Sequence, residues 1–276
     1  MKVIKASGNK EAFSSKKIYY SILESGASKQ LARDTTKIVK QKIRENITTD
    51  QIYKLIITKL KKEPGVAERY NLKRAIMSLG PAGYAFEKYF AEILEAYGYK
   101  TKVGIHLKGK KIQHEVDVLA EKKNKYMIEC KYHNQTGIHT RLQPALAAYA
   151  RFLDLKQHKI DQPWLVTNTR CTRDATNYAK GVNLKITSWM PQNSSIRGTP
   201  GGDPQKDSLQ QLIEKKKLYP ITVLFLEESI RQAFLNNRII MLKTLVEMQT
   251  EELFRKTNIP IKDLEKLQER AKKIIS

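Results

Sequence analysis

The stretch "HEVDVLAEKKNKYMIECKYHN", residues 114–134, constrains the fold more than any other part of the chain. Apolar and polar residues alternate on both sides of a lysine-rich turn, a pattern typical of two antiparallel strands joined as a hairpin. Each strand has one predicted apolar face, formed by Val116, Val118 and Ala120 on the first and by Ile128, Cys130 and Tyr132 on the second. The opposite faces carry Asp117 on the first strand, and Glu129 and Lys131 on the second. A hairpin that is at least half buried is therefore predicted to hold two carboxylates and a lysine at its centre.

This combination of side chains fits the hydrolysis of a phosphodiester, which uses a cation held between substrate oxygens and an attacking water. Mg²⁺ takes oxygen ligands, usually one or two carboxylates together with water and phosphate. A turn centred near Lys123 would place Asp117 across from Glu129, with Lys131 on the same face to polarise water or phosphate. The alternative is a solvated strand face on which the carboxylates pair with neighbouring lysines.

The helix predicted before the hairpin, "GYAFEKYFAEILEAYGY", adds a third carboxylate. Its inward stripe consists of Phe86, Phe90, Leu94 and Tyr97. Glu87 flanks this stripe, so we expect it to reach the sheet while staying partly solvated.

Residues 82–190 resemble the Mrr-like restriction endonucleases of the PD-(D/E)xK nuclease fold. The resemblance is carried by the helix above, by "HEVDVLA" and "IECKYHN", and by "WLVTNTRCTRDATNYAKGVNLKITSW", in the same order. It implies an α/β core with a central mixed sheet flanked by helices, and a Mg²⁺ or Mn²⁺ ion. The residues that it implies are Asp117, Glu129 and the main-chain carbonyl of Cys130 as metal ligands, Lys131 as a catalytic residue, and Glu87 as an assisting one.

Two positions depart from the pattern of that group. The usual proline–aspartate pair is Val116-Asp117 here, and the usual Gln-x-x-x-Tyr helix has Gln143 followed by Tyr149 at a different spacing. Gln143 is kept as a catalytic candidate, because this group usually has a glutamine in that helix.

The charge of the chain points to a polyanionic partner. Lys and Arg total 51 against 28 Asp and Glu, a net charge of +23, and such a surface attracts nucleic acid, nucleotides or acidic membranes. No apolar run approaches the ~20 residues of a membrane span, and no membrane partner is expected. The resemblance to restriction endonucleases implies DNA, which we expect to be double-stranded. Two cysteines without metal-ligand spacing, and a start that lacks a secretory signal, favour the cytoplasm. A merely solvated basic surface is the alternative.

Residues 1–80 contain "VIKASGNKEAFSSKKI", a predicted turn at Gly8 with lysines around Phe13. It is not a P-loop, and an ordinary basic hairpin is the alternative. The block resembles an ATP-cone, a small helical regulatory module with an N-terminal β-hairpin. The resemblance implies ATP or dATP as an allosteric ligand that is bound without hydrolysis. The candidate nucleotide-binding residues are Lys5, Gly8, Lys10, Phe13 and Lys17.

Residues 191–207 are rich in Pro, Gly and Ser and are predicted to be a linker. Residues 208–276 are predicted to be all-helical, with one continuous helix over "TVLFLEESIRQAFLNN", residues 222–237. We expect this module to serve helix packing or dimerisation, which leaves a homodimer open.

The sequence thus predicts a multidomain α+β and α/β chain: an ATP-cone, a nuclease domain and a helical C-terminal module. The function that it favours is a nucleotide-regulated, Mg²⁺-dependent DNA endonuclease. Two alternatives stay open. One is a non-catalytic, nucleotide-responsive DNA-binding regulator on a nuclease-like scaffold, and the other is a DNA-repair or RNA-directed nuclease.

Overall fold

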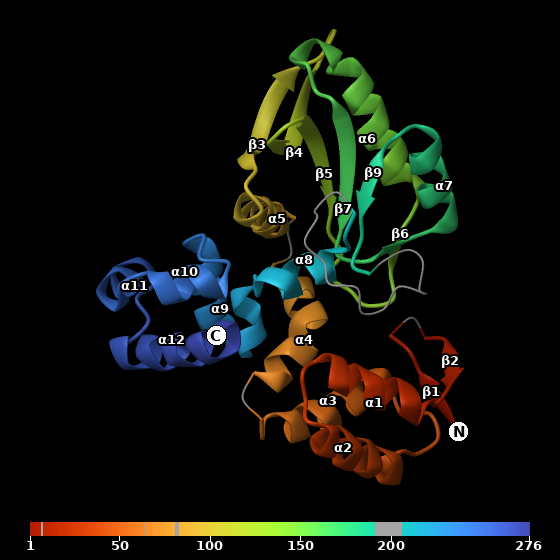
Figure 1. The fold of residues 1–276 in the computed structure, drawn as a ribbon, viewed down its shortest axis with the longest axis vertical. Coiled ribbons are helices and arrows are strands. Elements are labelled where there is room, and N and C mark those ends of the chain that lie inside the picture. Colours follow the sequence, from red (N-terminus) through yellow and green to blue (C-terminus); the bar gives the residue numbers. More distant parts are fainter. Residues whose placement is uncertain (7, 64, 81–82, 191–205) are drawn as a thin grey trace.

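The computed structural model describes residues 1–6, 8–63, 65–80, 83–190 and 206–276. Figure 1 shows an N-terminal module of a hairpin and helices, a sheet flanked by helices, and a group of helices at the C-terminal end. The predicted linker, apart from Lys206 and Asp207, lies outside the described residues. Within the described ranges no helix is both long and apolar enough to cross a membrane.

The N-terminal module begins with β1 (Lys2–Ile4) and β2 (Lys10–Ala12), which pair antiparallel. The left-handed backbone of Gly8, with φ of +80°, closes their turn, as only glycine does without strain. Four helices follow: α1 (Ser15–Glu24), α2 (Lys29–Lys42), α3 (Thr49–Leu60) and α4 (Val66–Met77). The hydroxyls of Ser14, Ser28 and Thr48 cap α1, α2 and α3 by accepting backbone N–H groups.

The second part is a mixed five-stranded sheet in the order β3-β4-β5-β7-β9. Its strands are β3 (Lys100–Lys108), β4 (Gln113–Glu121), β5 (Lys125–Lys131), β7 (Gln162–Thr167) and β9 (Lys185–Thr187). The helix α5 (Tyr84–Ala96) packs against β3 and β4, whereas α6 (Leu142–Asp154) and α7 (Arg173–Gly181) cover β5, β7 and β9. A 3₁₀ turn, Lys156–His158, follows α6. Two short parallel strands that the sequence did not predict are β6 (His139–Thr140) and β8 (Arg170–Cys171).

The hairpin of β4 and β5 has the predicted register. Val118 pairs with Ile128 and Glu121 with Lys125, so the turn is centred at residue 123. The predicted apolar face is only partly right, because Val116 packs in a different buried cluster from Val118. Alternation along β4 therefore does not bring all of its apolar residues into one cluster.

The C-terminal part consists of α8 (Leu209–Lys216), the 3₁₀ turn η2 (Ile221–Leu224), α9 (Glu228–Asn236), α10 (Leu242–Glu247), α11 (Thr250–Thr257) and α12 (Ile261–Ile275). The prediction of one helix over residues 222–237 is wrong. Phe225 has a left-handed backbone with φ of +53° and separates η2 from α9. The residues before it, 221–224, are buried and form a short 3₁₀ turn that starts directly after Pro220.

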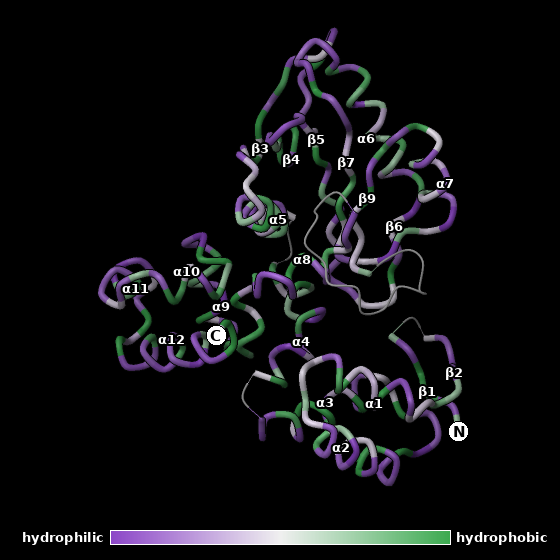
Figure 2. Tube along the Cα trace, in the orientation of Figure 1, coloured by the Kyte–Doolittle hydropathy of each residue, from purple (hydrophilic) through white to green (hydrophobic). Residues whose placement is uncertain are grey.

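One apolar core joins the second and third parts. The cluster that holds Phe90 of α5 and Trp164 of β7 continues through Leu212 of α8 to Phe234 of α9. A buried hydrogen bond also joins these two parts of the chain: the hydroxyl of Tyr89 on α5 donates to the carbonyl of Leu218, which follows α8, at 2.7 Å. Figure 2 shows hydrophobic residues along α5 and the central strands, and hydrophilic residues at the turns that end the sheet.

This shared core generates a stability prediction. Phe234 is fully buried, and truncating such a ring costs about 3–5 kcal/mol through lost burial and a residual cavity. We expect Phe234→Ala to lower the free energy of unfolding by that amount. The sheet and the C-terminal helices should still unfold in one transition, at a lower urea concentration. Urea unfolding followed by tryptophan fluorescence and by circular dichroism measures both. Phe254→Ala, at a ring that is 40% exposed, is the matched control and should change little. Two separate transitions in the wild-type chain would contradict one cooperative core.

A second prediction concerns Glu92 of α5, whose side chain is only 20% exposed. Burial raises the pKa of this carboxyl to about 7, although Lys88 lies 3.8 Å away. Because the folded pKa exceeds the unfolded value of about 4.5, the folded state loses stability as the pH rises through this interval. We expect Glu92→Gln to be more stable than wild type at pH 8 by about 1–3 kcal/mol.

The gain of Glu92→Gln should shrink as the pH is lowered toward 5, which urea unfolding at several pH values measures. Glu265→Gln, at an exposed carboxylate of α12, is the control and should show no pH-dependent gain. An equal effect of Glu92→Gln at pH 5 and pH 8 would contradict the raised pKa.

Candidate active site

The hairpin brings the predicted carboxylates together where β4 and β5 leave their regular pairing. The ladder ends at Val118 and Ile128, one residue short of Asp117 and Glu129. The main-chain N–H of Cys130 donates to Oδ2 of Asp117 at 2.6 Å, which ties the Asp117 side chain to β5. Lys131, at the end of β5, is exposed. The hairpin thus presents two carboxylates beside an accessible lysine.

Glu87 joins this group from the first turn of α5. The pKa of its carboxyl is raised to about 7, first by burial and then by the negative charges of Asp117, Glu115 and Glu129. Burial, followed by the charge of Asp117, likewise raises the pKa of Glu129 to about 7. The pKa of Asp117 is raised by burial, while the hydrogen bond from Cys130 opposes the shift. These carboxylates are close enough to repel one another, which is unfavourable without a cation.

Arg151 of α6 supplies one cation. Its Nη1 forms an ion pair with Oε2 of Glu129, and both side chains are only 20–25% exposed. The sequence analysis missed Arg151, because nothing in the spacing along α6 distinguishes it from a solvent-exposed arginine. It also missed Glu115, which the alternation along β4 places two residues before Asp117 and which could have been found there.

Gln143, in contrast, is exposed in the first turn of α6, and its side chain makes no hydrogen bond within the described part of the chain. The helix face that meets Glu129 is reached two turns later, at Arg151. Two histidines of the region have structural partners: His114 contacts Asp154 at 2.7 Å, and His133 contacts Thr140 at 3.0 Å.

No group of three or more His, Cys, Asp and Glu side chains in the described ranges is arranged to hold a metal ion. The carboxylates Glu87, Asp117 and Glu129 nevertheless all offer oxygen ligands, and burial, followed by the charge of neighbouring carboxylates, raises their pKa values. Such a set suits a hard divalent cation, which would offset the repulsion.

The N-terminal module has a cavity of about 360 Å³ beside its hairpin, lined in part by Lys5, Phe13 and Lys17. Both lysines pair with Glu11, and these hydrogen bonds lower the pKa of the Glu11 carboxyl to about 2. Gly8 shapes the turn and Lys10 is exposed on β2, and neither lines this cavity.

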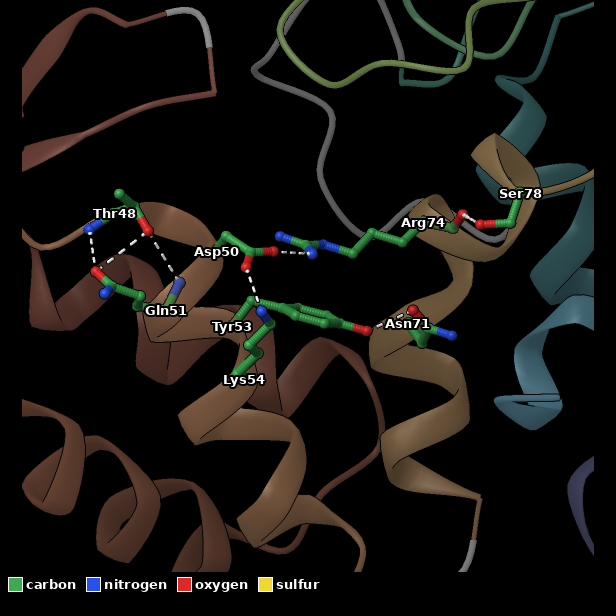
Figure 3. Close-up of polar contacts among 8 residues, drawn as sticks. All are labelled: Thr48, Asp50, Gln51, Tyr53, Lys54, Asn71, Arg74 and Ser78. Carbon is green, nitrogen blue, oxygen red and sulfur yellow. Dashed lines mark hydrogen bonds and ion pairs between the residues drawn. The ribbon is translucent and has the colours of Figure 1, made fainter. Parts of the chain in front are cut away.

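Aromatic side chains that the sequence analysis did not single out form another wall of this cavity. Tyr53 and Tyr70 both line it and stack at 6.1 Å. The guanidinium of Arg74 lies 3.6 Å from the centre of the Tyr53 ring, and the Tyr53 hydroxyl donates to Asn71 at 2.5 Å. Figure 3 shows these contacts between α3 and α4. The cavity therefore combines an aromatic wall with two lysines that are paired with Glu11.

Comparison with protein families gives three matches along the chain. Residues 1–77 match the model of the ATP cone domain, and residues 81–191 match that of a restriction endonuclease. Residues 219–275 match the model described as AF1548-like, C-terminal. The predicted fusion of an ATP-cone to a restriction-endonuclease-like domain is confirmed.

Individual relatives extend this result. An uncharacterized protein of Archaeoglobus fulgidus is 34% identical over 186 residues, which is 67% of this chain and 99% of the relative. The crystal structure of the protein of unknown function AF1548 has a TM-score of 0.59 at 33% identity and covers 70% of this chain and 98% of its own. Can2 from Sulfobacillus thermosulfidooxidans, in complex with cyclic tetra-adenylate, has a TM-score of 0.33 at 13% identity over 63% of this chain and 51% of its own, a likeness too low to carry an argument. The chain belongs to the family of the A. fulgidus protein, and it carries an ATP cone domain followed by a restriction endonuclease domain.

Proposed function

We propose that the protein is a Mg²⁺-dependent DNA endonuclease whose activity responds to a nucleotide bound by its ATP cone domain. The observation that carries the proposal is the group of half-buried carboxylates Glu87, Asp117 and Glu129 beside the exposed Lys131. The restriction endonuclease match supports the same reaction class, and the net charge of +23 supports a polyanionic substrate.

In this proposal Asp117, Glu129 and the main-chain carbonyl of Cys130 would hold a Mg²⁺ or Mn²⁺ ion, with Glu87 assisting. The ion would supply charge stabilisation at the phosphate and acidify a water. Lys131, at the open end of β5, would bind the phosphate and stabilise the charge that develops on it. Arg151 would favour the ionised form of Glu129, because its positive charge opposes part of the upward shift of the Glu129 pKa that burial causes.

The ion pair between Arg151 and Glu129 also favours a second candidate, a DNA-binding regulator that does not cleave. In such a protein the arginine would permanently replace the metal as the partner of Glu129. A plasmid-cleavage assay with Mg²⁺, Mn²⁺ or chelator separates the two functions, since only the nuclease nicks or linearises DNA. Retention of salt-dependent DNA binding without any cleavage would favour the regulator.

The nuclease proposal makes a direct mutational prediction. Asp117→Asn and Glu129→Gln keep the shape of each side chain but remove a ligand charge, and Lys131→Ala removes the phosphate-binding cation. We expect each variant to lose cleavage by at least about 100-fold, which corresponds to about 2.7 kcal/mol at the transition state. DNA affinity, measured by fluorescence anisotropy, should change only a few-fold, because the basic charge is distributed over the chain.

Glu121→Gln is the matched control, since Glu121 is an exposed carboxylate at the distal end of the same strand β4. It should cleave like wild type. Calorimetry with Mn²⁺ adds a readout besides activity, and Asp117→Asn should bind the ion more weakly. Metal-dependent cleavage retained in Asp117→Asn would contradict the assignment of the site.

The nucleotide part of the proposal rests on the cavity beside the hairpin. Removing both of its lysines in Lys5→Ala plus Lys17→Ala takes away two positive charges and should weaken ATP binding by at least about tenfold, or 1.4 kcal/mol. Lys29→Ala plus Lys37→Ala removes the same charge from the exposed face of α2 and should leave affinity nearly unchanged. Calorimetry on the full chain with ATP and dATP measures both. Thin-layer chromatography of the recovered nucleotide should show no hydrolysis. No binding by wild type at millimolar nucleotide would contradict this part of the proposal.

A further inference from the structure

A second and larger cavity, of about 600 Å³, lies between the ATP cone domain and the nuclease domain. Lys5 of the hairpin, the start of α3 at residues 48–50, and Arg74 of α4 form its walls on one side. Asn134, Gln135 and Thr136, which follow β5 in the nuclease domain, form a wall on the other. Side chains of both domains therefore face one shared space.

The wall on the ATP cone side has the chemistry of an anion site. Arg74 is held by Asp50, with Nη1 2.6 Å from Oδ1, and by its stacking on Tyr53 at 3.6 Å. Figure 3 shows Asp50 between Arg74 and Lys54, so that this acid is already shared by two cations. The first-turn N–H groups of Thr49 and Asp50 add donors, since helix geometry leaves them without intrahelical partners, whereas that of Gln51 already donates to the Thr48 hydroxyl.

The two cavities adjoin at Lys5 and Thr49, because both of these residues line each of them. The smaller cavity has an aromatic wall of Phe13, Tyr53 and Tyr70, against which a base can pack, and the larger one carries Arg74. A nucleotide whose base lies against the rings would pass Lys5 with its phosphates and enter the larger cavity.

The wall contributed by the nuclease domain is anchored on both sides. His133 and Asn168 exchange two hydrogen bonds, from His133 N–H to Asn168 Oδ1 at 2.9 Å and from Asn168 Nδ2 to the His133 carbonyl at 2.7 Å. The hydroxyl of Tyr132 donates to the carbonyl of Met77 on α4 at 2.5 Å. After the loop, β6 pairs with β8 at His139. The loop is thus held in place against the ATP cone domain.

We propose that Asn134, Gln135 and Thr136 complete the nucleotide site, so that the nuclease domain binds the terminal phosphates of the nucleotide held by the ATP cone domain. This inference rests on the proposed function and names the residues through which the nucleotide acts. The terminal phosphate competes with Asp50 for Arg74 and accepts hydrogen bonds from the loop. A nucleotide with fewer phosphates reaches Lys5 but not the loop, so the site distinguishes ATP from AMP.

The loop is connected to the proposed catalytic residues through the main chain, because it follows Lys131 by only a few residues on the continuation of β5. A ligand acts on activity only if it binds one arrangement of the protein better than another. Phosphates seated against the loop favour the arrangement in which the loop, and with it the end of β5, is fixed.

The test uses calorimetry on the full chain, with ATP and AMP, in chelator so that no divalent ion bridges carboxylate and phosphate. Gln135→Glu keeps the shape of the side chain and adds one negative charge inside the cavity. Asn124→Asp is the matched control, because it adds the same charge to an exposed residue of the same domain, in the turn at the other end of β5. We expect Gln135→Glu to weaken ATP binding by at least about fivefold and AMP binding by less than twofold, and Asn124→Asp to change neither.

Thermal unfolding of both variants checks that they fold like wild type. The truncation Gln135→Ala removes the side-chain amide without adding charge, so its ATP affinity should lie between those of wild type and Gln135→Glu. Equal ATP affinity of wild type and Gln135→Glu overturns the shared site but leaves the nucleotide-regulated nuclease standing. No ATP binding by wild type overturns both. Unchanged ATP affinity with weakened DNA binding in Gln135→Glu makes the cavity a site for nucleic-acid phosphates, and also overturns the inference.

Discussion

The packing of α5 against the sheet is the interaction on which the rest of the molecule depends. Phe90 meets Trp164 edge to face at 5.6 Å, and the neighbouring Tyr89 fixes the helix to the C-terminal part, because its buried hydroxyl donates to the carbonyl of Leu218 just after α8. The same helix presents Glu87 to the hairpin. Because one rigid helix does all three, the position of a catalytic candidate is set by the apolar core rather than by a surface loop.

That core imposes an electrostatic cost on the site. Residues that lie next to buried apolar side chains lose water, and for Glu129 and Glu87 this raises the pKa of each carboxyl to about 7. An arginine on a third element, α6, offsets part of the cost. The arrangement is unfavourable for stability alone, which is why a functional role explains it better than a structural one.

Some of these structural features could be predicted from the sequence and others could not. Alternation and the lysine-rich turn predicted the hairpin register, because a two-residue period and a turn centre determine which residues face each other. Periodicity failed at Phe225, where tertiary burial of residues 221–224 imposes a left-handed break without glycine. Arg151 could not be predicted, since its contact with Glu129 depends on how α6 crosses the sheet. The cavity that joins two domains has no local signal in either of them.

Strand β5 connects the two candidate sites with little intervening structure. It carries Glu129 and Lys131, and its continuation reaches the cavity lined by Arg74 within five residues, at most ~17 Å of extended chain. On the other side, Arg74 and Met77 lie one turn apart on α4, so the residue facing the cavity and the carbonyl bonded to Tyr132 belong to one rigid element. Coupling between the proposed nucleotide and nuclease sites then requires only the relative displacement of one helix and one strand, which are linked through Tyr132, the residue that follows β5. A longer chain of side-chain rearrangements is unnecessary.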